Sequence, residues 1–98
     1  MNVEDLLQSA RTDDAPPDGL SDELQALWYA KNDEWETAHR IAQEIHTSTG
    51  SWIHALLHLI EGDTGNANYW FRQAGKPPRR IADIDSLWSE IAAVLLQS

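Results

Sequence analysis

Clusters of glycine, proline and aspartate divide this chain into short segments. The clusters lie at residues 12–20, 62–65 and 75–78. Between them, apolar residues recur at spacings of three and four, and no segment keeps the alternating pattern of a strand. The sequence therefore predicts an all-α fold, in which about five short helices form antiparallel hairpins with short connections.

The length of the chain allows one domain. Ninety-eight residues are enough for a single hydrophobic core and too few for two. We expect an N-terminal helix with a Pro/Asp linker over residues 1–20, two helical hairpins over 21–75, and a C-terminal capping helix over 83–98. All three parts belong to one predicted domain, 1–98.

Small polar residues and glycines mark the predicted helix ends. A polar side chain before an amphipathic segment can accept a hydrogen bond from the first turn of a helix, and glycine ends helices readily. Four N-caps are predicted on this basis: Asn2 for residues 3–11, Ser21 for the next helix, Asp33 as a capping box with Glu36, and Ser51 for residues 52–61. Three ends are predicted: Gly50, Gly62 and Gly75, before a last helix over about 85–97.

Charge and composition exclude several classes of function. The chain has 16 acidic and 7 basic residues, a net charge of −9, and no cysteine. An acidic protein is a poor match for nucleic acid or an anionic membrane, and without thiols it has no disulfides and no thiolate metal site. No apolar run is long enough to span a bilayer, and no signal peptide is recognisable. We therefore expect a cytoplasmic protein with no nucleic-acid or membrane partner and no cofactor.

Two segments of the chain align with each other. Residues 26–45 and 55–74 match with Ala26 over Ala55 and Ala38 over Ala67. The second segment resembles a tetratricopeptide repeat through Gly62-Asp63, Ala67, Phe71, Ala74 and Pro77. That resemblance implies helical hairpins that recognise a protein segment, although the spacing of the two units is shorter than the family's 34 residues and Thr64 replaces a usual aromatic. Because two units are fewer than a stable solenoid needs, other helices or a second subunit must cover the ends.

A longer stretch carries a second resemblance. Residues 52–72 read W-I-H-A-x-L-H-x-x-E-G-D-x-x-N-A-x-Y-W-F-R. This pattern is similar to one found in small uncharacterised bacterial proteins. It supports the helical fold and implies no activity.

The candidate site is a stripe of polar residues on the predicted helix 52–61. His54, His58 and Glu61 are spaced i, i+4 and i+7, so they share one face of the helix. Two imidazoles and a carboxylate can bind zinc or act as an acid–base unit. The pattern is not that of a zinc protease, because Ala55 occupies the position of its glutamate.

Three other interpretations of this stripe remain open. The histidines can form a solvated face, a packed contact satisfied by Asn66, Asn68 or Tyr69, or a contact between subunits. The sequence favours packing or an interface over metal. His39 and His46 are interpreted as isolated, with His46 near a helix C-terminus, and a groove is predicted from Asn66, Tyr69 and Arg72.

The predicted function is a protein-interaction module that binds a protein or peptide through its helical-repeat surface. The alternatives are a small enzyme or metal-binding protein that uses His54, His58 and Glu61, and a structural homodimer subunit. Five tryptophans suggest core or interface anchors, and hence a homodimer. The predicted core is Leu24, Leu27, Trp28, Trp35, Ile41, Leu56, Leu59, Trp70, Phe71 and Leu95.

Overall fold

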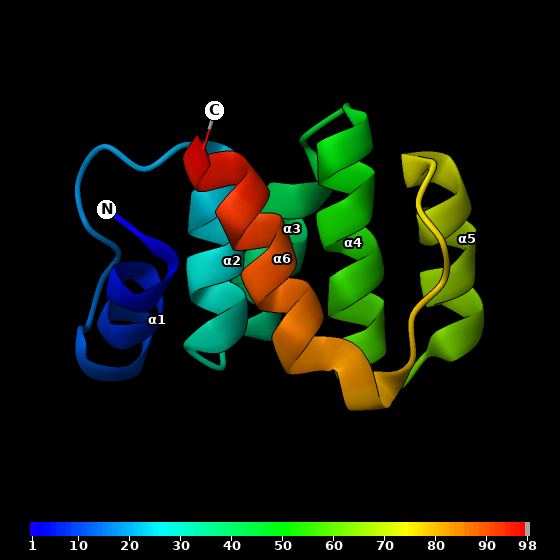
Figure 1. Ribbon diagram of the computed structural model, residues 1–98, viewed down its shortest axis with the longest axis horizontal. Helices are drawn as coiled ribbons and strands as arrows, with labels where there is room; N and C mark the ends of the chain where they lie inside the picture. The colour runs from blue at the N-terminus through cyan, green and yellow to red at the C-terminus, as the bar shows by residue number, and fades with distance from the viewer. Residues whose placement is uncertain (98) are drawn as a thin grey trace.

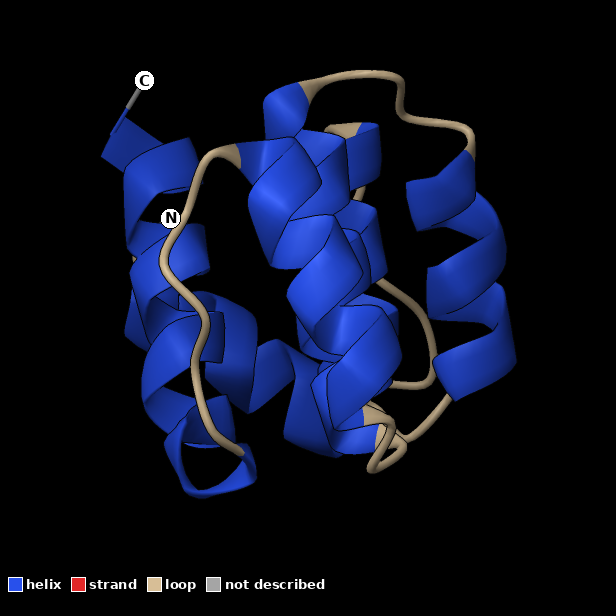
Figure 2. Cartoon of the chain, turned by 90° about the vertical axis from the view of Figure 1, so that its right-hand side faces the viewer, coloured by secondary structure: helices blue, strands red, loops and turns tan. Residues whose placement is uncertain are grey.

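The computed structural model describes residues 1–97, and within that range the regular structure is entirely helical (Figures 1 and 2). It measures 32 × 25 × 22 Å. There are six α-helices and a short 3₁₀ helix, η1: α1 (Val3–Thr12), α2 (Asp22–Lys31), α3 (Trp35–Gln43), α4 (Ser48–Ile60), α5 (Thr64–Ala74), η1 (Ile81–Asp83) and α6 (Ile84–Gln97). The all-α prediction is confirmed, with six helices instead of about five. The predicted end of the last helix, residue 98, lies outside the described residues.

Helix α4 is the centre of the fold. It packs against α2, α3, α5 and α6, while α1 packs against α2 and α6 at one end of the molecule. Figure 1 shows α1 and α5 at opposite ends, with the other helices between them. The central position of α4 follows from its composition, since every residue from Trp52 to Leu59 is buried. A helix that is apolar on nearly all sides must be covered on all sides.

Three of the helix starts and ends agree with the predicted capping residues. Asn2 caps α1 in a capping box with Asp5, and Ser21 accepts a hydrogen bond from the backbone N–H of Leu24 at 3.2 Å. Gly75 ends α5 with a left-handed backbone, φ 69°. These ends depend on residues that are close in sequence, which is why the sequence reveals them.

The predicted boundaries between α3 and α4 are wrong. Asp33 does not cap α3, because its φ of 71° places it in the turn and Glu34 becomes the N-cap without a side-chain bond. Thr47, and not Ser51, caps α4 by accepting from the N–H of Gly50 at 3.1 Å. Helix α3 also ends at Gln43 instead of continuing toward Gly50.

Gly50 is the third residue of a helix, although the sequence predicts that a helix ends there. It lies in the first turn of α4, and a Cβ there would sit 2.1 Å from the carbonyl oxygen of Ile45. Any side chain would therefore push the α3–α4 connection away from α4. Glycine is required at this position by a close backbone approach and not by helix termination.

The core is larger than the periodicity predicts. Leu24, Leu27, Trp28, Leu56, Leu59 and Phe71 are buried as expected, whereas Trp35, Ile41, Trp70 and Leu95 are only partly buried. Residues outside the predicted set complete the core, among them Leu6, Ile53, Leu57, Leu87, Trp88 and Ile91. Ala38 and Ala67, expected at close helix contacts, are fully buried. Within residues 1–97, no helix is long and apolar enough to cross a membrane.

Candidate functional site

Three histidines from two helices meet beside α4. His39 comes from α3, and His54 and His58 come from successive turns of α4. The Nε2 atoms of His39 and His54 are 2.8 Å apart, and one ring nitrogen from each of the three residues lies within 4.8 Å of the others. We call His39, His54 and His58 the imidazole cluster. Its two members on α4 are buried, since His54 and His58 are each only 6% exposed, and His39 is half-buried.

Glu61 holds one member of the imidazole cluster in a fixed orientation. Its Oε1 lies 2.6 Å from Nδ1 of His58. A carboxylate accepts hydrogen bonds, so Nδ1 of His58 carries a hydrogen and donates it. The prediction that His58 and Glu61 act together on one face is consistent with this contact.

Two tryptophans form the walls of the imidazole cluster. Trp35 stacks on His39 with ring centres 4.7 Å apart, and Trp70 stacks on His54 at 3.9 Å with the planes 10° apart. The indole N–H of Trp35 donates to the carbonyl oxygen of Leu57 at 2.6 Å, which ties α3 to α4. These contacts restrict the rings of His39 and His54, whose Nε2 atoms face each other.

The environment keeps two of these imidazoles neutral. Burial, and then the neighbouring His39 and His58, lower the pKa of His54 to about 4. Burial and His58 also lower the pKa of His39, although Glu61 opposes that shift. Neutral imidazoles offer lone pairs, which is the form that binds a metal ion.

The structure corrects several expectations about this site. The histidines do not form a solvated face, and their partners are His39 and Glu61 instead of Asn66, Asn68 or Tyr69. Those three residues, together with Arg72, are exposed on α5, where Asn66, Tyr69 and Arg72 follow one another along the helix. Glu61 is at the edge of the site, with a side chain 37% exposed.

His39 was not predicted as a site residue, and its role depends on tertiary contact. It lies 15 residues from His54, and only the α3–α4 turn brings the two together. A signal was available in the i, i+4 pair of Trp35 and His39, which places an aromatic and an imidazole on the same face of α3. His46 lies three residues after Gln43, the last residue of α3, and its interaction with that helix's C-terminus stays a prediction.

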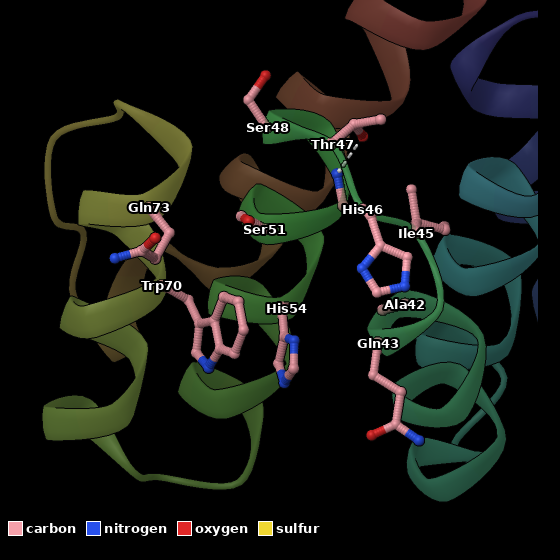
Figure 3. Close-up of a pocket in the computed structure, with 11 residues that line it drawn as sticks. Ala42, Gln43, Ile45, His46, Thr47, Ser48, Ser51, His54, Trp70 and Gln73 are labelled. Atoms are coloured by element: carbon pink, nitrogen blue, oxygen red, sulfur yellow. Dashed lines mark hydrogen bonds between the residues drawn. The ribbon is translucent and has the colours of Figure 1, made fainter.

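A pocket of about 350 Å³ opens next to His54 (Figure 3). We call it the α4 pocket, because it lies at the N-terminus of that helix. Figure 3 shows the His54 ring flat against Trp70, with His46 and Gln43 on the other side. Its lining residues are Ala42, Gln43, Ile45, His46, Thr47, Ser48, Gly50, Ser51, His54, Trp70 and Gln73.

A second group of ligand-type residues, His58, Glu61 and Asp63, is also close together. Here the carboxylates already have partners: Oδ1 of Asp63 accepts from the N–H of Asn66 at 3.1 Å, and Glu61 binds His58. Both acids are exposed. This group is therefore better described as a helix cap beside an orienting carboxylate.

Comparison of the chain with protein-family models, with curated proteins and with solved structures finds no match. The geometry of the site is thus the basis for assigning a function.

Proposed function

We propose that this protein binds a transition-metal ion, with zinc as the best match, through His39, His54 and His58. The observation that carries the proposal is the convergence of three ring nitrogens within 4.8 Å of one another, two of them on buried side chains. Histidine nitrogen is a favoured zinc ligand, and three protein ligands leave a fourth position for water or another group.

The arrangement of Glu61 supports this assignment. Histidines that bind metals commonly donate their other ring N–H to a carboxylate, which fixes the tautomer and raises ligand basicity. Glu61 has this relation to His58, at 2.6 Å. The choice of zinc over magnesium or calcium follows from the nitrogen donors, because those two ions prefer oxygen.

The distance between the facing nitrogens of His39 and His54 is close to that of a zinc site. Zinc–nitrogen bonds of about 2.0–2.1 Å in a tetrahedron place ligand atoms roughly 3.3 Å apart. The Nε2 atoms of His39 and His54, at 2.8 Å, need to separate by only a fraction of an ångström. In the metal-free protein one of the two must carry a hydrogen between them, and a cation replaces that hydrogen.

Metal titration of matched histidine variants tests the proposal. The protein is stripped with chelator and titrated with zinc by calorimetry, and bound zinc is measured after dialysis. We expect one zinc per chain, and a loss of affinity of at least about tenfold for His39→Ala. His39 is the suitable variant because it is the least buried member of the imidazole cluster.

His46→Ala is the matched control, since His46 is exposed and is the one histidine of the chain outside the imidazole cluster. It should bind zinc like the parent. Equal zinc binding by the parent and His39→Ala, or none by the parent, would refute the proposal.

We also propose that this protein is an interaction module whose α5 surface binds a second copy of the chain. Asn66, Tyr69 and Arg72 share the outer face of α5, and Tyr69 is 46% exposed. An exposed tyrosine beside polar groups is typical of protein-binding surfaces. Light scattering at high micromolar concentration should give a homodimer that Tyr69→Glu dissociates; a monomeric parent would contradict it.

The tetratricopeptide resemblance, the cytoplasmic location and the absence of a nucleic-acid partner stay predictions.

A further inference from the structure

We propose that the α4 pocket binds a small carboxylate, and that a metal in the imidazole cluster strengthens this binding through His54. The inference rests on the proposed metal function and extends it to a ligand. The argument depends on the second nitrogen of His54, on the groups that line the pocket, and on the N-terminus of α4.

The Nδ1 atom of His54 has no hydrogen-bond partner within the described residues. The hydrogen bond of this ring joins its Nε2 to Nε2 of His39. Every described side-chain nitrogen or oxygen that is fully buried does have a partner. Nδ1 is therefore accessible to solvent although the residue is 94% buried, and the opening that His54 lines is the α4 pocket. A polar atom that is unsatisfied by the protein and directed at a cavity marks a place for a ligand group.

The lining of the α4 pocket favours an acceptor of hydrogen bonds. It includes the hydroxyls of Ser48 and Ser51 and the amides of Gln43 and Gln73, which can all donate. No aspartate or glutamate lines it, although the chain has 16 acidic residues. A cation would find no carboxylate here, whereas a carboxylate would meet side-chain hydroxyls and amides that can turn a donor toward it.

The first turn of α4 adds donors at the same place. The N–H of Gly50 is capped by Thr47, but the N–H of Ser48, which lines the pocket, has no acceptor within residues 1–97, and neither has that of the adjacent Thr49. Free N–H groups and the positive end of the helix dipole stabilise an anion. The exposed ring of His46 lines the same pocket. Because α4 has 13 residues, its dipole is fully developed at this end.

A metal ion couples the pocket to the imidazole cluster through the tautomer of His54. In the metal-free protein, the hydrogen between His39 and His54 can lie on either Nε2, so Nδ1 of His54 is a donor in only one of the two arrangements. When Nε2 binds a metal, Nδ1 must carry the hydrogen. The metal-loaded protein therefore always presents a donor to the pocket, and metal and carboxylate should strengthen each other's binding.

Amide-resolved titration with sodium acetate tests this proposal. Zinc-free and zinc-loaded protein are titrated at constant ionic strength, with sodium chloride as the reference salt, and ¹H–¹⁵N shifts are followed. We expect saturable shifts at Ser48 and Thr49, with acetate binding about fivefold or more tighter in the zinc-loaded protein. The same coupling predicts an equal gain in zinc affinity when acetate is present.

Two variants test where acetate binds. Ser51→Leu fills the α4 pocket and should abolish the saturable shifts while zinc affinity stays unchanged. Ser89→Leu is its matched control, because Ser89 is also a half-buried helical serine, on α6 and outside the pocket. His46→Ala changes an exposed lining residue without risk to the fold, and should weaken acetate binding severalfold.

The outcomes separate this inference from the proposed metal function. If zinc binds but acetate produces no saturable shifts, or binds equally well to the Ser51→Leu and His46→Ala variants, the carboxylate pocket is wrong and the metal site stands. Equal acetate affinity with and without zinc would overturn the coupling. If zinc does not bind to the parent, the proposed function fails first.

Discussion

Two regions of this small protein bury polar side chains, and they do so differently. Between α1, α2 and α6, the indole N–H of Trp28 donates to Oγ of Ser9 at 3.0 Å, and that of Trp88 donates to the carbonyl oxygen of Leu27 at 2.8 Å. The carbonyl of Leu27 can only accept a hydrogen bond, and the hydroxyl of Ser9 can rotate so that its oxygen accepts one. Each indole donor therefore faces an acceptor. In the imidazole cluster, groups of the same kind face one another instead.

The difference separates a structural contact from a candidate binding site. An indole and an acceptor satisfy each other completely, so burying them costs little. In the imidazole cluster, the facing Nε2 atoms of His39 and His54 share a single hydrogen, and a metal ion can take the place of that hydrogen. Mutations around Trp28 and Trp88 should therefore change the free energy of unfolding equally with and without metal. Mutations in the imidazole cluster should also change the stabilisation that a metal provides.

The largest effect is expected from Trp88→Ala. Trp88, on α6, is 1% exposed and reaches Leu27 of α2, so its removal leaves a large cavity. We expect the free energy of unfolding to fall by about 3–5 kcal/mol, measured by chemical denaturation, with or without zinc. Ile81→Ala, at a residue 49% exposed, should change it little. Equal losses in the two variants would contradict the core described above.

Zinc should stabilise the parent protein by a comparable amount. A ligand present at 100 times its dissociation constant raises the free energy of unfolding by about 2.7 kcal/mol when it binds only the folded state. Thermal melts with and without zinc should show this gain in the parent and His46→Ala, and lose it in His39→Ala. A gain that persists without His39 would place the metal elsewhere.

Ser9→Ala probes the complementary contact. The variant leaves the buried indole N–H of Trp28 without an acceptor, and we expect a loss of about 1–3 kcal/mol in chemical denaturation. Zinc should neither rescue nor enhance this loss, because Ser9 is not part of the imidazole cluster. Ser89→Ala is the control, and a loss equal to its own would show that the contact contributes nothing.

The smallest expected effect is a dependence on pH in the zinc-free protein. The pKa of His54 is about 4 in the folded state, below its ordinary value of 6.5, so the unfolded chain binds more protons between these values. The contribution of His54 is complete above pH 6.5 and is lost progressively as the pH falls toward 4. We expect a loss of about 1.4 kcal/mol, the equivalent of one pKa unit, because solvent screening reduces the full effect.

This pH dependence is measured against His54→Gln, because carboxylates also titrate in the same range. The parent should lose more stability than the variant on acidification, and His46→Gln should behave like the parent. If stability depended on pH in the same way in the parent and in His54→Gln, the pKa of His54 would not be lowered by its surroundings in the folded state.

Much of the candidate site was visible in the sequence, but its chemistry was not. The i, i+4, i+7 spacing of His54, His58 and Glu61 is a helical property, and two of the three residues do interact directly. The third ligand, His39, belongs to another helix, so no local pattern links it to α4. The partners predicted for the histidines, Asn66, Asn68 and Tyr69, are on the wrong face of α5 because rotation of one helix about another is set by packing.

By itself, the sequence determined the all-helical class and several helix ends, those at Asn2, Ser21 and Gly75, because capping, glycine turns and helical periodicity act over three or four residues. Tertiary structure alone decided that Gly50 lies in the first turn of a helix. Glycine is needed there because the backbone of Ile45 approaches it closely across the α3–α4 turn. It also decided that His39 joins His54 and His58. Which imidazoles face one another depends on how α3 docks against α4, and docking is determined by the side chains of the whole core acting together.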